Sequence, residues 1–296
     1  MSHTTHSMSK TLATAIILSL ATLILEVAGG IYTGSLALLS DASHLFSDFL
    51  ALTITLIALR IARRPATAKH TFGYHRAEVF GALINGLLLL IMAASIGVAA
   101  WQRLNMPHEV KAELVSIIGL IGILPNIWTV IRLRQSRNIN IKSAFLHALG
   151  DTASSVVVVV SGVVIALTGL NQFDALASFV VVAFLLIGAI RLIKNVAIIF
   201  LEGAPPNLNR EKISKAVCGL PGVVSTHDVH LWTLCSDVVY FTGHLIIDGK
   251  PNLREAQEIV AKAAKTLDHL GVHHTTLQIE TPDHACTKIE ICEIAY

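Results

Sequence analysis

Two apolar stretches of this sequence each contain a histidine followed four residues later by an aspartate. The pairs are His44 with Asp48 and His147 with Asp151. Residues four apart lie on the same face of a helix, so each pair places an imidazole beside a carboxylate. If the two helix faces meet, they supply four nitrogen and oxygen ligands, the donor set of a tetrahedral zinc site.

Helix packing alone is a weaker explanation of the two pairs, because ionisable residues are costly inside an apolar span. Imidazole ligands favour zinc and the later transition metals, with cadmium and cobalt as the alternatives. The four cysteines all lie after residue 201, which argues against a copper(I) path through the apolar segments. Asp41, before the first pair, is expected either to support a histidine or to cap a helix.

These pairs must be positioned by apolar segments, and six segments reach the length of about 20 residues that a membrane-spanning helix needs. Only 14% of the chain is charged, against about a quarter in ordinary soluble domains. The first segment is longer than a signal peptide and contains Glu26, so we expect a permanent helix. The predicted spans are residues 11–32, 36–59, 78–101, 113–133, 144–168 and 174–200.

The loops differ in charge, and this difference predicts the orientation of the spans. Lysine and arginine are concentrated in the loops after the second and fourth spans, while the loops after the first and fifth spans have none. Short loops rich in these residues face the cytoplasm. With six spans, we therefore expect the N-terminus and the C-terminus both to be cytoplasmic.

The chain changes character after residue 201, where Pro205 and Pro206 end the last apolar helix. Asn209 is positioned to cap a short helix, and the pattern that follows is typical of a small open-faced α+β sandwich in the order αββαβ. We therefore predict three parts: a cytosolic tail over residues 1–10, a transmembrane domain over 11–201 and a cytosolic domain over 205–296. Its expected strands are residues 223–233, 238–247 and 272–280, with helices at 209–219 and 252–269.

Charge and cysteine content argue against a nucleic-acid partner and against disulfide bonds. A net charge of +2 without a basic stripe argues against a nucleic-acid partner. The cysteines form no CxxC pair and are expected to be reduced thiols: Cys218, Cys235, Cys286 and Cys292.

The energy source follows from the same residues. The sequence has no phosphate-binding loop of the G-x-x-x-x-G-K-[ST] type. Histidine titrates near neutral pH, and metal binding requires deprotonated ligands, so zinc and protons compete for one site. This competition predicts a zinc/proton exchanger, which is a secondary transporter and not an enzyme. The rival hypotheses are an intramembrane zinc hydrolase, although His-Glu-x-x-His is missing, and a membrane metal sensor.

Several motifs together resemble the cation diffusion facilitator family, and specifically its bacterial zinc-type branch. They are residues 40–44 with Asp48, residues 71–78, His147 with Asp151, and residues 227–232. The resemblance covers nearly the whole chain. It implies a homodimeric zinc/proton antiporter of the bacterial inner (cytoplasmic) membrane, in contact with lipid, with a ferredoxin-like cytosolic domain that binds regulatory zinc.

The resemblance also implies metal ligands in the cytosolic domain: His227, His244, His273 and Glu280. His273 and Glu280 have opposite parity on a regular strand, so both reach one site only across a bulge or bend. His274 has the parity of Glu280 and is the alternative. Some relatives have another metal site in the loop after the second span. Here Thr67 and Tyr74 replace two of its ligands and only His70 remains, so we expect that site to be lost or weakened.

Other polar residues lie within the apolar segments. We expect Glu26 and Asn85 to line a water path. Asp174, at the predicted start of the sixth span, is expected to act as a helix cap.

Overall fold

The computed structural model describes residues 2–284 except 134–138, 207, 236–237 and 250. Within these residues, six helices are long and apolar enough to cross a membrane. They are α1 (Ser2–Thr33), α2 (Leu36–Ala62), α3 (Ala77–Asn105), α4 (Ala112–Leu133), α5 (Ile139–Thr168) and α6 (Gln172–Phe200). Helix α1 begins at Ser2, so the structure continues it through residues 2–10, which were expected to form a tail.

The chain forms two compact units. One comprises Met1–Ile54 with Ile84–Leu192, and the other comprises Thr55–Leu83 with Ile193–Tyr296. The division falls inside α2, α3 and α6. One end of each of these helices therefore belongs to the same unit as the C-terminal domain.

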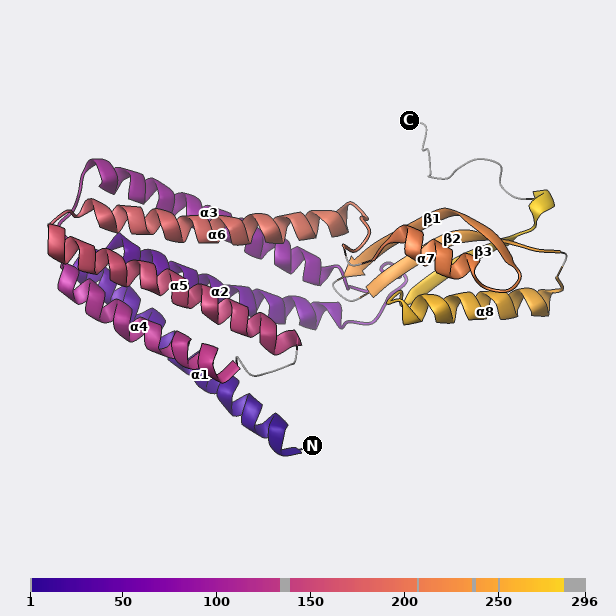
Figure 1. The fold of residues 1–296 in the computed structure, drawn as a ribbon, viewed down its shortest axis with the longest axis horizontal. Coiled ribbons are helices and arrows are strands. Elements are labelled where there is room, and N and C mark those ends of the chain that lie inside the picture. Colours follow the sequence, from indigo (N-terminus) through magenta and orange to yellow (C-terminus); the bar gives the residue numbers. More distant parts are fainter. Residues whose placement is uncertain (1, 134–138, 207, 236–237, 250, 285–296) are drawn as a thin grey trace. The chain divides into compact units, whose positions relative to one another are not determined.

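The first unit is a helix bundle, in which α4 packs against both α1 and α5. Helices α3 and α6 run side by side (Figure 1) and share an apolar cluster that includes Ala93, Ile96 and Val181. A second cluster joins α2, α4, α5 and α6 through Leu38, Val115, Val158 and Ala177, among others. These buried residues are mostly small or β-branched, which allows the helix backbones to approach closely.

The C-terminal domain has the expected αββαβ order. Its elements are α7 (Arg210–Cys218), β1 (Val223–Cys235), β2 (Val238–Ile247), α8 (Leu253–His269) and β3 (His274–Glu280), followed by the 3-10 turn Pro282–His284. Strand β2 is central, antiparallel to β1 and parallel to β3. The side chain of Asn209 accepts a hydrogen bond from Lys212 N at 3.0 Å, which confirms it as the α7 cap. Asn252 caps α8 in the same way.

In the described part of the chain, helices cover one face of this three-stranded sheet. Alternate residues of β2, including Phe241 and Leu245, are fully buried against α7 and α8. Because side chains alternate between the two faces of a strand, the residues between them lie on the open face. His244 is one of these residues, so the open face presents the histidine that the sequence singled out.

Candidate metal sites

The structure brings three of the four intramembrane candidates together. His44 and Asp48 lie one turn apart on α2, with His44 Nδ1 3.3 Å from Asp48 Oδ2. Asp151 reaches them from α5, and one ligand atom from each of the three residues lies within 4.8 Å of the other two. His147 lies on α5 one turn before Asp151, but its side chain is outside the described residues.

These residues line a hollow of about 420 Å³ within the helix bundle. Gly150 and Gly188 add no side chains to its wall, and Phe184 of α6 provides an apolar surface. Arg191, also on α6, lines the same hollow. All three candidate ligands are half-buried, so an ion bound to them would be partly shielded from water and still reachable.

Asp41 has a role that was not among the two expected from sequence. Its carboxylate accepts hydrogen bonds from the hydroxyl groups of Ser154 and Ser155, at 2.7 Å from Ser155 Oγ. All three side chains are buried. Asp41 is on α2 and the serines are on α5, so these bonds join the two helices that carry the His-Asp pairs. The only sequence signal for the serines is a polar pair beside a run of valines.

Asp174 caps a helix, but the helix is α2 and not its own α6. Its carboxylate accepts hydrogen bonds from Leu36 N at 2.7 Å, from Ala37 N at 3.2 Å and from Ser35 Oγ. Arg103 of α3 lies 3.4 Å from the same carboxylate and also donates to the backbone oxygen of Gly34. A negative charge at a helix N-terminus is favourable, so this contact fixes the start of the helix that carries His44.

A second group of candidate ligands lies on the open face of the C-terminal sheet. Glu280 Oε1 is 2.8 Å from His244 Nδ1, and Glu280 Oε2 is 3.2 Å from His227 Nε2. Glu280 is 6% exposed and the two histidines are half-buried. His227 pairs with His244 across the β1–β2 ladder, and His244 pairs with Gln278 next to Glu280. Two imidazoles and a carboxylate at these distances form a donor set that suits zinc.

Asp228 supports this second group from a strained backbone. Its φ of 49° is in the left-handed region, at the bulge between His227 and His230 where the β1–β2 register shifts. The bulge presents the carboxylate to the other side of the His244 ring, with Asp228 Oδ2 3.6 Å from His244 Nε2. Carboxylates often orient metal-binding histidines in this way. The sequence reasoning did not single out Asp228.

The structure does not bring His273 or His274 to this group. His274 pairs with Tyr240 at the start of β3, whereas Glu280 pairs with Ile246 at its end. Each strand residue advances the chain by about 3.3 Å, so the length of β3 separates these histidines from Glu280. His273 is exposed immediately before the strand, and its backbone N–H donates to Val239 O.

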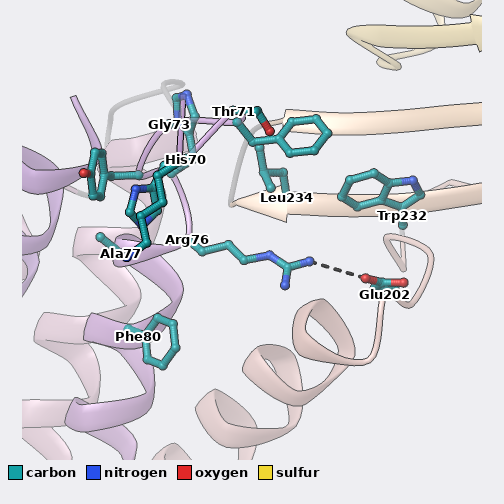
Figure 2. Close-up of a pocket in the computed structure, with 13 residues that line it drawn as sticks. His70, Thr71, Gly73, Arg76, Ala77, Phe80, Glu202, Trp232 and Leu234 are labelled. Atoms are coloured by element: carbon teal, nitrogen blue, oxygen red, sulfur yellow. Dashed lines mark ion pairs between the residues drawn. The ribbon is translucent and has the colours of Figure 1, made fainter. Parts of the chain in front are cut away.

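The loop between α2 and α3 lines another hollow, of about 610 Å³, with Glu202 and with Trp232 and Leu234 of β1 (Figure 2). Arg76 lies 3.6 Å from Glu202 across it, and Trp232 forms part of the wall. His70, the remaining candidate ligand of this loop, stacks on Tyr74 with ring centroids 4.6 Å apart. Its backbone N–H donates to Thr67 Oγ1.

Two family models match the two parts of the chain. The model of the cation efflux transmembrane domain matches residues 12–201, and the model of the cytoplasmic domain of cation efflux proteins matches residues 205–282. The chain therefore belongs to the cation efflux family, the cation diffusion facilitators that its motifs resemble. It is a multi-pass membrane protein of the metal efflux class.

Curated relatives cover most of the chain. The "Cadmium, cobalt and zinc/H(+)-K(+) antiporter" of Bacillus subtilis is 32% identical over 98% of this chain and 95% of its own length. The "Metal cation efflux system protein CzcD" of Cupriavidus metallidurans is 34% identical over 92% and 86%. The "Zinc transporter ZitB" of Escherichia coli is 33% identical over 87% and 83%.

Proposed function

We propose that this protein exports zinc from the cytoplasm in exchange for protons. The observation that carries the proposal is the meeting of His44 and Asp48 from α2 with Asp151 from α5 around one hollow in the bundle. His147 is the fourth ligand, because its place one turn before Asp151 puts it on the same helix face. The site is then tetrahedral with two imidazoles and two carboxylates, which favours zinc.

The relatives support the choice of cargo and coupling. Zinc appears in the printed names of the Bacillus and Escherichia proteins, with cadmium, cobalt and protons in the former. Cadmium and cobalt are therefore the alternative cargoes of this chain. Protons compete with the metal for His44 and His147, since an imidazole binds metal only in its deprotonated form. Zinc release and proton binding can then alternate at one site.

The orientation and assembly belong to the same proposal. The basic loops after the second and fourth spans place both termini, and the domain over residues 205–296, in the cytoplasm of a bacterial cell. In that domain His227, His244 and Glu280 bind a regulatory zinc ion that is not the cargo. Two copies of the chain form a homodimer, in keeping with the matched cytoplasmic domain of cation efflux proteins.

Metal flux into liposomes tests the transport site. The purified protein is reconstituted with a pH gradient, and zinc, cadmium and cobalt uptake are compared for the wild type, Asp151→Asn and Asp248→Asn. Asp248 is an exposed residue in the turn after β2 and serves as the matched control. We expect Asp151→Asn to reduce zinc flux by more than the 10–100-fold typical of changes around a metal site. Normal flux in folded Asp151→Asn would contradict the proposal.

A further inference from the structure

Glu26 is an acidic residue in the second half of α1 that the proposed transport site does not use. Its side chain is 0% exposed. Neither carboxylate oxygen has a hydrogen-bond partner among the side chains and backbone that the structure describes. The apolar window Ile16–Thr33 surrounds it on both sides along the helix, and Glu26 does not line the hollow at His44.

The neighbouring helix α4 leaves room for this carboxyl group. A Cβ atom added to Gly122 would lie 2.6 Å from Glu26 Oε1 and 3.4 Å from a methyl carbon of Thr22. Any residue larger than glycine would therefore displace the carboxyl group. Since α1 and α4 pack directly on each other, the space at Gly122 is part of the helix interface and is occupied by the Glu26 head group.

Two charged groups in the described part of the chain act on Glu26 from other helices, and both are acidic. Asp41 of α2 and Asp151 of α5 are close enough to interact with it electrostatically, and on α4 the Glu26 carboxyl group lies against Gly122. An ionised carboxylate buried without partners is expensive, and two acidic neighbours add repulsion. Binding a proton removes both costs.

We infer that Glu26 is a proton-binding site of the membrane domain, distinct from the metal ligands. It holds a proton while the metal site is empty. A divalent cation bound at Asp151 offsets the negative charge of the aspartates, and Glu26 then gives its proton to water and becomes a carboxylate. This inference rests on the proposed exchange of metal for protons and adds Glu26 as the residue that carries one of the protons. A residue that only filled the α1–α4 interface would not respond to metal.

Two equilibrium measurements on the purified full-length protein test this inference. The first counts protons released per zinc bound in weakly buffered solution. The second records the infrared carbonyl band of protonated carboxylic acids before and after zinc addition. The variants are Glu26→Gln, which keeps the shape of the side chain, and Glu113→Gln, an exposed glutamate in the first turn of α4 that serves as the control.

In the wild type and in Glu113→Gln, we expect zinc to diminish the carbonyl band. In Glu26→Gln that change disappears and proton release falls by about one per zinc. For each unit by which the pH rises, the factor by which zinc affinity increases is then about tenfold smaller than in the wild type. Equal proton release and an equal band change in wild type and Glu26→Gln would overturn the inference while leaving the exchange proposal intact. If the wild type released no protons at all, the exchange proposal would fail as well.

Gly122→Ala tests the same carboxyl group without changing Glu26, so it remains informative if Glu26→Gln does not fold. It keeps the carboxyl group but places a methyl group at the oxygen, so we expect the zinc-sensitive band to shift in frequency. A band that is insensitive to Gly122→Ala belongs to a different carboxyl group, and this result also counts against Glu26.

Discussion

The carboxylate of Asp41 on α2 accepts a hydrogen bond of 2.7 Å from Ser155 on α5. Ser154 donates a second hydrogen bond to the same carboxylate. Together these bonds join the two helices whose His-Asp pairs form the candidate metal site. The relative position of the pairs therefore depends on residues that do not contact the metal.

Ser155→Ala should destabilise the protein by about 1–3 kcal/mol, because it leaves a buried carboxylate with one hydrogen bond fewer. Ser161→Ala is the matched control, since Ser161 is a buried serine on the same helix whose hydroxyl has no hydrogen-bond partner in the described structure. Thermal unfolding in detergent measures the difference. Equal melting temperatures for the two variants would show that the Asp41 contact does not stabilise the bundle.

Asp174→Asn should cost about 0.5–2 kcal/mol, the usual effect of losing a helix cap, because it removes the charge that faces the start of α2 and Arg103. Glu109→Gln, at an exposed position between α3 and α4, removes a charge without a capping role. Asp174→Asn should unfold at a lower temperature in detergent and transport zinc more slowly. Glu109→Gln should match the wild type in both measurements. An unchanged Asp174→Asn protein would mean that Ser35 and the backbone suffice to start the helix.

His44→Asp should widen the range of metals transported, with cadmium or manganese gaining relative to zinc, because oxygen ligands discriminate less strongly for zinc. An unperturbed histidine titrates near pH 6.5 and an aspartate near pH 4. An aspartate binds protons less strongly than a histidine, so protons should compete less with the metal in His44→Asp and the pH dependence of zinc flux should flatten.

Initial flux of each metal in liposomes at several pH values measures both effects of His44→Asp. His75→Asp, in the loop between α2 and α3, makes the same chemical change outside the site. If His44→Asp transported the same metals in the same proportions as His75→Asp, selectivity would not depend on this ligand.

His244→Ala should remove the zinc ion of the cytosolic domain without affecting the transport site. The test is equilibrium dialysis of the full-length protein in an Asp151→Asn background, which isolates the cytosolic ion. We expect affinity to fall by more than the 10–100-fold that loss of a supporting residue costs. His269→Ala, exposed in the last turn of α8, is the control; equal zinc binding in both variants would exclude His244 as a ligand.

Much of the fold followed from patterns that are local in the sequence. Apolar length predicted the six helices, and the strand patterns together with the cap at Asn209 predicted the αββαβ domain, both of which are confirmed. Helical spacing also predicted that His44 and Asp48 share a face, because one turn separates them. These features depend on neighbours in the chain, so single-sequence reasoning reaches them.

The features that were missed depend on how distant segments align. Ser154 and Ser155 contact Asp41 only because of the relative rotation of α2 and α5. Asp174 caps α2 because the start of α6 lies beside it. The position of His273 depends on the register between β2 and β3, two parallel strands separated by α8. Periodicity does not define that register.

The two acidic contacts of α2 have a mechanical consequence. Asp174 connects the N-terminus of α2 to α6 and, through Arg103, to α3, and Asp41 connects α2 to α5 about one and a half turns further along. The candidate ligands His44 and Asp48 follow on the same helix. Access to the ion could change from one side of the membrane to the other if α2 slid past α5. That movement would break the buried hydrogen bonds of the Asp41 carboxylate. Rocking α2 and α5 together as one unit would keep those bonds, and in the proposed transport cycle a bound ion would then move together with its ligands.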